Sequence, residues 1–487
     1  MFGFFKNRKA TRRKKIAFKR FLQTAGATNL EKSWNSHPEI ADQFMSRELR
    51  TVVARSREQA LNNGNAKKYC LFLKDNIAGS QGFRLVCECK DRDGTLDEYA
   101  NKAIENAYKD FSRKENFLVT GTHTRRQLER QISSTFATDG EVIVRKRYNK
   151  KYKYGIKFEL LDPLFLDPNC NEDLRNGNHV RLGIEINSDG QPLAYHFSQK
   201  VDRIGASPYD ANRRTRIPAD EIIHSFCPEL INQRRGLPKL LPALWRMRML
   251  AGYEDSAVTN ARIGASKMAM FRDPQAESED NEDLAIDSFT PGELLDIGTR
   301  ELQEYNPAYP NGEFDAFTKA SMRSLAAGLG ISYASLSGDL TEVNYSSIRQ
   351  GSLEEREHFS GLQEDLIDDL IRPIYECWLE MALLKESILI NGKTLKILKL
   401  DKYKEAKFIG RRWKSIDPQK DMSAQQIAIN MGIKSRAQVI RENGGQEPED
   451  VWREIKKESE DLIDILPNSK SAVAGETKYV VNSNKNE

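Results

Sequence analysis

Hydrophobic and polar positions follow two different spacings over the first 200 residues or so. Helical spacing of apolar residues predicts helices at 40–62, 96–111 and 125–137. Short apolar or alternating runs predict strands at 69–73, 83–89, 141–148 and 154–161, the last two forming a hairpin around Asn149 and Lys150. Turn signals such as 187–190 separate further short strands. This half of the chain is therefore predicted to mix helices with strands.

Longer helical patterns dominate the second half. They predict helices at 238–265, 317–329, 346–384, 421–431, 435–443 and 448–464. Either Pro238 or Pro242 fits the first turn of the 238–265 helix, and Pro373 predicts a kink in the longest helix. A short hairpin is predicted around Asn391 and Gly392. The apolar side of the 238–265 helix comprises Leu241, Leu244, Trp245, Met249, Tyr253 and Val258. Together the two halves predict an α+β fold.

The charge of the chain is balanced overall but separated locally. Of the 487 residues 30% are charged, yet the formal net charge is only +4. Residues 1–20 contain nine Lys or Arg and no acidic residue, whereas residues 273–299 contain nine Asp or Glu and no basic residue. The basic arm, with phenylalanines interleaved, fits nucleic acid, an RNA scaffold or an acidic partner, and equally well a mobile, solvated terminus. The polar tail at 467–487 is predicted to be disordered.

Membrane and secreted classes are disfavoured. No apolar run reaches the roughly 18 residues that a membrane span needs. The basic N-terminus lacks the apolar stretch of a signal peptide. The six cysteines include no CxxC pair, which favours reduced thiols over a metal site or a disulfide scaffold. No membrane partner is therefore expected.

The tip of the predicted 141–161 hairpin is rich in basic and aromatic residues. Its cations are Arg145, Lys146, Arg147, Lys150, Lys151 and Lys153. Such side chains can neutralise phosphates without reading a base sequence. A solvated hairpin face explains the same pattern, and the sequence leaves both interpretations open.

Catalytic signatures are missing from the sequence. There is no HExxH or other zinc spacing and no GxSxG elbow. The run 392–394, Gly-Lys-Thr, resembles the end of a phosphate-binding loop, but Ser387 stands where that loop needs glycine. Asp401, Glu405 and Lys407 faintly resemble a nuclease set for Mg²⁺, although a solvated charge run is favoured. No catalytic residue, metal site or cofactor is expected.

One ordered set of segments is distinctive. Residues 317–356 read FTKASMRSLAAGLGISYASLSGDLTEVNYSSIRQGSLEER. They are accompanied by DGEVIV at 139–144, RIPADEIIHSF and QRRGLPKLLPAL within 216–244, PGELLDI at 291–297 and YNPAYPNGEF at 305–314. In order and spacing, this set resembles the lambda-type family of tailed-phage portal proteins over roughly residues 40–460.

The resemblance implies a division of the chain into structural parts. These are a basic flexible arm at 1–30, the first part of an α/β wing at 31–237, stem helix 1 at 238–266, an α/β clip at 267–316, stem helix 2 at 317–335, a tunnel loop at 336–346, a long kinked helix with wing return strands at 347–412, a helical crown at 413–466 and a disordered tail at 467–487. In a ring, apolar stripes on the stem helices can be buried against a neighbouring subunit as well as within the chain.

The resemblance also implies which residues face the channel. The DNA-facing tunnel loop would comprise Gly338, Asp339, Leu340, Thr341, Glu342, Val343 and Asn344. The stem would contribute the cations Arg246, Arg248, Arg262 and Lys267. The acidic residues of the loop repel phosphate, which suits a conduit through which DNA slides better than a binding site.

The function that the resemblance implies is structural. A homo-dodecameric ring at one capsid vertex would conduct double-stranded DNA, without sequence specificity, during packaging and ejection. Its partners would be the terminase large subunit, head-completion or connector proteins, and capsid and scaffold proteins. It would be assembled in the host cytoplasm and reside in the virion. The alternatives are a metal-dependent nucleic-acid enzyme, and a capsid adaptor or scaffold without a DNA channel.

Overall fold

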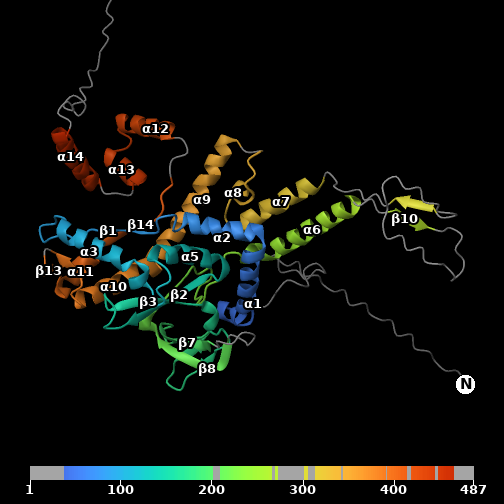
Figure 1. Ribbon diagram of the computed structural model, residues 1–487, viewed down its shortest axis with the longest axis horizontal. Helices are drawn as coiled ribbons and strands as arrows, with labels where there is room; N and C mark the ends of the chain where they lie inside the picture. The colour runs from blue at the N-terminus through green and yellow to red at the C-terminus, as the bar shows by residue number, and fades with distance from the viewer. Residues whose placement is uncertain are drawn as a thin grey trace, which may run out of the picture. The chain divides into compact units, whose positions relative to one another are not determined.

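The computed structural model describes residues 38–200, 209–265, 269–272, 301–304, 313–341, 344–390, 392–413, 418–444 and 448–465 (Figure 1). Its contacts divide the chain into two compact units, Met1–Arg411 and Arg412–Glu487. Helices and strands are mixed throughout the first unit, and the helices described in the second unit are α12 to α14, so the predicted α+β class is confirmed.

The first unit contains helices from 41 to 404. They are α1 (Ala41–Asn62), α2 (Gly64–Asn76), α3 (Glu98–Phe111), α4 (Lys114–Phe117), α5 (Arg125–Thr138), α6 (Leu241–Ala265), α7 (Glu313–Gly328), α8 (Tyr333–Ser337), α9 (Tyr345–Leu366), α10 (Arg372–Leu384) and α11 (Leu400–Lys404). Short 3-10 turns occur at η2 (Pro163–Phe165), η3 (Ala219–Glu221) and η5 (Ile397–Lys399).

The strands of this unit form separate antiparallel sheets. A five-stranded sheet follows chain order: β4 (Glu172–Asp173), β5 (His179–Arg181), β6 (Ile184–Ile186), β7 (Pro192–Lys200) and β8 (Tyr209–Pro218). A three-stranded sheet has β2 (Glu141–Tyr148) between β3 (Ile156–Leu161) and β9 (Ile222–Phe226). Two-stranded pairs are β1 (Arg84–Cys87) with β14 (Ala406–Ile409), β10 (Ala269–Arg272) with β11 (Glu301–Glu304), and β12 (Leu389–Ile390) with β13 (Lys393–Thr394).

A cluster of aromatic rings forms one core of the first unit. Trp378 is fully buried, and its ring centroid lies 4.9 Å from that of Tyr108 and 5.5 Å from that of Phe111. The other members are Phe117, Tyr154, Phe158 and Tyr375. The rings come from α3, α4, the β2–β3 loop, β3 and α10, so residues more than 200 positions apart in sequence share this core.

The strand predicted at 69–73 is wrong, because these residues lie inside α2. Asn63 caps the start of the helix: its side-chain oxygen accepts hydrogen bonds from the N–H groups of Asn65 and Ala66. Its buried residues include Ala66, Tyr69 and Leu73, which recur at helical spacing. A short apolar run does not distinguish a strand from a buried helical turn, and the Asn63 cap decides this one.

The remaining predicted elements are confirmed with shifted ends. The hairpin of β2 and β3 pairs Tyr148 with Ile156, and the loop runs from 149 to 155. Helix α6 begins at Leu241, so Pro242, rather than Pro238, lies in its first turn. The helix pattern from 346 to 384 is interrupted by the π-helical segment η4 (Ile367–Ile371), directly before Pro373. Proline lacks the N–H that would bond to the carbonyl four residues earlier, and a widened turn accommodates this loss.

The apolar side predicted for α6 is wrong in part. Leu244 is buried as expected, but the side chains of Trp245, Met249 and Val258 are exposed. The helix turns Ala243, Met247 and Leu250 into the protein instead. Helix periodicity identifies apolar stripes, but it does not say which of them the chain itself covers.

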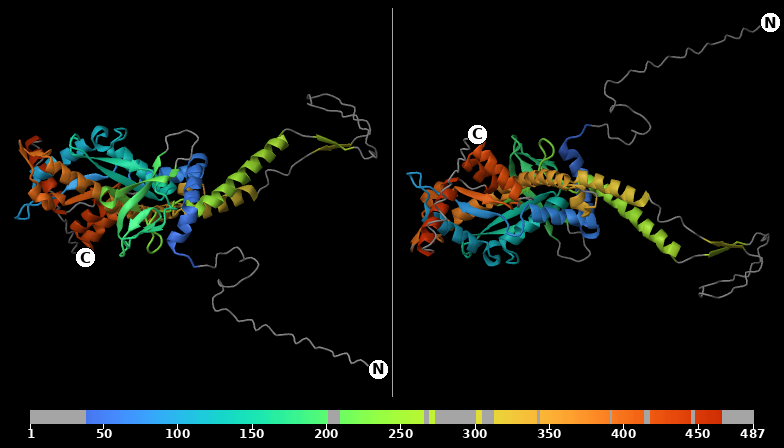
Figure 2. Two further views of the ribbon diagram at one scale, coloured as in Figure 1. Left: turned by 90° about the horizontal axis from the view of Figure 1, so that it is seen from below. Right: turned by 90° about the horizontal axis from the view of Figure 1, so that it is seen from above.

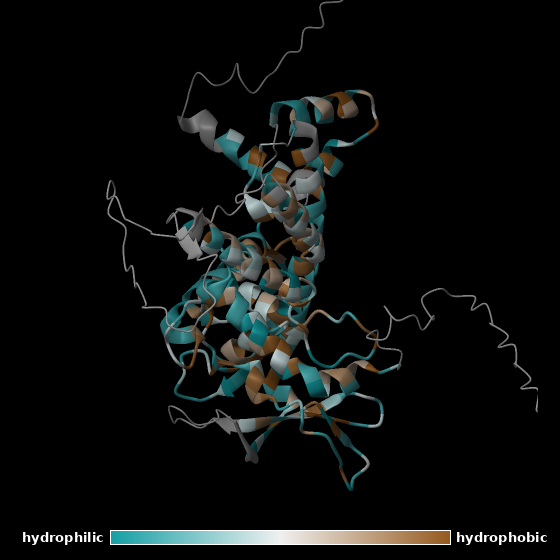
Figure 3. Ribbon diagram, turned by 90° about the vertical axis from the view of Figure 1, so that its right-hand side faces the viewer, coloured by the Kyte–Doolittle hydropathy of each residue, from teal (hydrophilic) through white to brown (hydrophobic). Residues whose placement is uncertain are grey.

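The second unit is described by three helices. They are α12 (Pro418–Asn430), α13 (Arg436–Gly444) and α14 (Pro448–Ile465), which match the three predicted there. Several large apolar side chains stay exposed on this unit, among them Met422, Met431 and Ile433. Figure 3 shows hydrophobic and hydrophilic residues interleaved along the helices of the chain. Within the described parts, none of the helices has both the length and the apolar character required to span a bilayer.

A buried ion pair joins the start of β2 to the segment before α6. The guanidinium of Arg235 donates to both carboxylate oxygens of Glu141, at 2.6 and 2.9 Å, and both side chains are 2% exposed. The Gly236 N–H donates to the same carboxylate at 2.9 Å, and Nε2 of His224 lies 3.1 Å from it. The guanidinium also donates to the carbonyl oxygens of Pro163, Leu166 and Leu182.

Two glycines allow this close approach. Gly140 has a φ of +77°, and a Cβ there would lie 2.1 Å from backbone atoms of Leu237. A Cβ on Gly236 would lie 2.1 Å from the carbonyl oxygen of Gly140. No side chain fits at either position without moving backbone, so glycine is required on both sides of the contact.

Arg235→Ala should strongly destabilise the first unit. The change leaves Glu141 buried without its counter-charge, and breaking such a pair costs about 3–5 kcal/mol. Urea unfolding followed by circular dichroism measures the change. The control is Arg147→Ala, which removes the partly exposed Arg147–Glu159 pair and should cost at most about 1 kcal/mol. Equal unfolding midpoints for the two variants would contradict the structural role of Arg235.

Glu141 should make stability depend on pH in the acid range. Burial alone would raise the pKa of Glu141, but Arg235 and His224 outweigh it and lower the pKa to about 2 from 4.5. The unfolded chain therefore takes up a proton first as the pH falls, and stability is lost between about pH 4.5 and about pH 2. Glu141→Gln, although less stable, should show a pH slope shallower by up to about 1.4 kcal/mol per pH unit. Parallel slopes in urea titrations would refute this.

Candidate functional site

Helices α6 and α7 lie side by side as a pair (Figures 1 and 2). The ring of Tyr253 on α6 contacts Phe314 and Phe317 on α7, with centroids 5.5 and 4.9 Å apart. Near the other end, Arg246 donates to the hydroxyl of Ser324. The two helices are thus joined along their length by ring contacts and a polar contact.

A capped loop follows this helix pair. Helix α8 ends at Gly338, whose φ of +77° is the left-handed conformation that glycine adopts readily. The carboxylate of Asp339 accepts from the N–H and the hydroxyl of Thr341 at 3.0 and 2.6 Å, and from the hydroxyl of Tyr333 at 3.0 Å. Leu340 is 61% exposed. The first part of the predicted tunnel loop is therefore an ordered turn that presents a leucine to its surroundings.

The loop carries a stable negative charge. The hydrogen bonds from the Thr341 hydroxyl and N–H, with that from Tyr333, lower the pKa of Asp339 to about 2. Asp339 is therefore ionised at every physiological pH. Glu342 and Val343 lie outside the described residues, and Asn344 leads into α9.

Glu355 of α9 attaches the start of α8, the helix before this turn, to α9. Its carboxylate accepts from the Ser332 N–H at 2.6 Å and from the Ser335 hydroxyl at 3.0 Å, and Glu355 is 9% exposed. Ser332 in turn caps the N-terminus of α8. This residue was not singled out from the sequence, although it lies within the distinctive 317–356 segment.

The predicted stem cations are placed as follows. Arg246, Arg248 and Arg262 lie exposed on α6, and Lys267 lies outside the described residues. Arg248 is paired with Glu58 of α1 at 3.6 Å, with both side chains more than half exposed. That these four side chains face a channel stays a prediction from the family resemblance.

The basic hairpin is partly neutralised within the chain. Arg145 pairs with Glu221 at 2.7 Å, Arg147 with Glu159 at 3.7 Å, and Lys153 with Asp110 at 2.7 Å. Lys150 and Lys151 are exposed at the tip, and Lys146 is half-buried beside Cys377. These pairs reduce the charge that the hairpin offers to phosphates.

The faint nuclease set does not form a metal site. Lys407 pairs with Glu88 at 2.8 Å across the β1–β14 pair, while Asp401 lies on α11 and Glu405 follows it. In the part of the chain that the structure describes, no group of three or more His, Cys, Asp or Glu could hold a metal ion. The 392–394 run lies in the β12–β13 hairpin, as the sequence favoured.

Several predicted features lie outside the described residues. They are the basic arm at 1–30, the acidic run at 273–299 and the tail at 467–487. From the 267–316 segment, β10 and β11 are described as an antiparallel pair.

The described residues thus form an α+β protein with a paired-helix element, α6 and α7, followed by a capped acidic loop. The model of the lambda family of phage portal proteins matches residues 27–363, more than half of the chain. The chain belongs to this family, which is structural and not enzymatic.

Individual relatives agree with this membership. The chain is 30% identical over 465 residues to a probable portal protein of Halomonas phage phiHAP-1, covering 92% of this chain and 87% of the relative. It is 23% identical over 479 residues to portal protein B of Escherichia phage lambda, covering 88% of this chain and 87% of the relative. Among solved structures, the neck of an empty gene transfer agent particle aligns at 13% identity with a TM-score of 0.43, covering 81% of this chain and 93% of the other.

Proposed function

We propose that twelve copies of this chain form a closed ring at one vertex of a phage capsid. Double-stranded DNA passes through the ring during packaging and ejection, without sequence-specific contacts. The observation that carries this proposal is family membership over residues 27–363, a span that includes the α6–α7 pair and the loop after it.

The local chemistry supports a conduit rather than a DNA-binding site. The ionised Asp339 repels phosphate, and the turn holds it in place through Thr341 and Tyr333. In the ring, α6 and α7 are the stem helices, 338–344 is the tunnel loop and the second unit is the crown inside the capsid. These assignments rest on the family resemblance.

Partners are assigned on the same basis. The 267–316 segment is the clip, where the terminase large subunit docks first and head-completion proteins dock later. Its acidic run from 273 to 299 suits a basic partner surface. Capsid and scaffold proteins surround the ring, which is assembled in the host cytoplasm.

The purified protein should assemble into rings. Twelve chains of 55.6 kDa give a particle of about 670 kDa with a central channel. Light scattering after size exclusion measures the mass, and electron microscopy shows symmetry and channel width. A stable monomer or dimer in all conditions contradicts the proposal, and a solid disc without a channel favours an adaptor instead.

Lengthening the loop between Gly338 and Tyr345 should block DNA packaging and leave ring assembly intact. A longer loop narrows the path of the DNA but does not touch the helix pair. The matched control inserts the same residues into the exposed turn at 187–190 between β6 and β7. Packaging in vitro and ring mass are the two measurements. Loss of assembly on lengthening the loop would instead make the loop a structural element.

A further inference from the structure

Helix α6 presents an apolar stripe that the described residues of its own chain leave uncovered. Leu241, Trp245 and Met249 follow each other at four-residue spacing and are 36%, 75% and 58% exposed. An exposed tryptophan in an apolar stripe is typical of a contact surface, because tryptophan dominates the binding energy of many interfaces.

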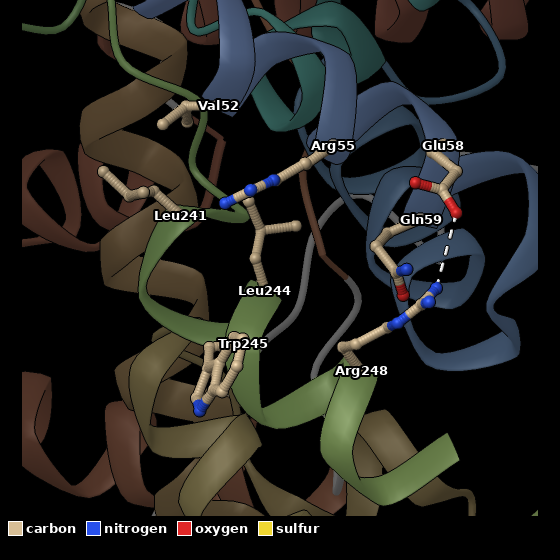
Figure 4. A pocket seen from close by; sticks show the side chains of 8 residues that line it. All are labelled: Val52, Arg55, Glu58, Gln59, Leu241, Leu244, Trp245 and Arg248. Carbon is tan, nitrogen blue, oxygen red and sulfur yellow. Dashed lines mark ion pairs between the residues drawn. The ribbon is translucent and has the colours of Figure 1, made fainter. Parts of the chain in front are cut away.

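The stripe borders a cavity between α6 and α1. The cavity measures about 420 Å³, and Val52 on α1 with Leu244 and Trp245 on α6 forms its apolar part. Figure 4 shows Arg55 reaching from α1 toward Leu244, while Arg248 pairs with Glu58 at the rim. The rim therefore carries a net positive charge around an apolar interior.

The loop between β9 and α6 ends in an apolar tip. Ile231 at its tip is 92% exposed, and Leu230 beside it is 47% exposed. The acidic residue beside the tip, Glu229, is half exposed and pairs with Lys239 at 3.1 Å. The other two charged residues of the loop, Arg234 and Arg235, pair with Asp42 and Glu141. The tip is therefore an apolar protrusion whose neighbouring charges are paired within the chain.

A buried glutamine holds this protrusion in a defined conformation. The side-chain oxygen of Gln233 accepts from the N–H groups of Glu229 and Leu230 at 2.9 and 3.0 Å, and its amide donates to the Arg235 carbonyl at 2.7 Å. Asn232 completes the turn with a φ of +61°. The loop is thus pre-organised to present two aliphatic side chains that the described chain does not cover.

We propose that Leu230 and Ile231 of one subunit insert into the cavity between α1 and α6 of the next subunit. This inference rests on the proposed ring, because a cyclic ring has head-to-tail interfaces in which each subunit brings two different, complementary faces. The acidic Glu229 then approaches the positive rim at Arg55 and Arg248.

The basic arm is the competing occupant of the cavity. Residues 1–37 precede α1 and carry phenylalanines, so the arm has both the length and apolar side chains to reach the cavity. Its nine Lys and Arg residues among the first 20 would, however, meet the positive rim. The charged residues of the β9–α6 loop are instead paired within its own chain, so charge favours the loop of a second copy.

Cross-linking in mixed rings tests the proposal. Ile231→Cys subunits are co-assembled with Trp245→Cys subunits, and a short thiol-reactive bismaleimide is added. Covalent dimers are expected, and they form only between subunits because each chain carries one of the two new thiols. The six native cysteines are buried or half-buried, and the wild-type ring sets their background.

Matched variants keep the outcome interpretable. Leu398→Cys is the control for Ile231→Cys, since Leu398 is 91% exposed on η5, and it should give no dimers with Trp245→Cys. Arg55→Cys at the rim replaces Trp245→Cys if the loss of the indole prevents folding. Phe18→Cys probes the arm.

The results separate this inference from the proposed function. Dimers specific to the Ile231 variant support the interface. Intact rings without such dimers, or dimers formed with Phe18→Cys instead, overturn the inference and leave the portal ring standing. A wild-type chain that forms no ring overturns the proposed function itself.

Discussion

The buried pair of Arg235 and Glu141 is the interaction on which the rest of the first unit depends. It joins β2, and through β2 both β3 and β9, to the residues that lead into α6. The three guanidinium nitrogens of Arg235 and the two carboxylate oxygens of Glu141 all form hydrogen bonds, and both side chains are 2% exposed. Removing either charge alone would therefore cost much of the stability of the unit. The direction in which α6 leaves the sheet region, and with it the place of α7, follows from this junction.

Several charged side chains elsewhere in the first unit also have hydrogen-bonding or oppositely charged partners within the unit. The basic hairpin, which stands out in the sequence, directs three of its cations to carboxylates of its own unit. Asp339 differs from these cations because its partners are uncharged hydroxyl and backbone N–H donors. Its negative charge is therefore not neutralised, and it stays at an exposed position. Near-neutral net charge thus conceals surfaces of distinct character, and it is compatible with DNA as a passing cargo rather than a bound ligand.

Elements with long, regular periodicity could be predicted from the sequence, as α1, α9 and the β2–β3 hairpin show. The helix α2 could not, because a five-residue apolar run fits either spacing and only the Asn63 cap distinguishes them. Contacts between residues distant in sequence could not be predicted either. Arg235 and Glu141 are 94 positions apart, and the segments that contain them resemble the family without indicating that the two side chains form an ion pair. The loop and stem residues carry no chemical signature of their own, so their roles came from resemblance alone.

The buried amide of Gln233 has a geometric consequence for the proposed assembly. It sets the direction in which Ile231 projects relative to α6, because the same segment continues through Arg235 into that helix. In a closed ring of twelve, each copy turns by about 30° relative to the last, and eleven or thirteen copies differ from this by only about 2–3°. In the proposed assembly, the conformation of this short loop sets the angle between neighbouring subunits and therefore the number of copies in the ring. The hydrogen bonds of the Gln233 side chain hold that conformation.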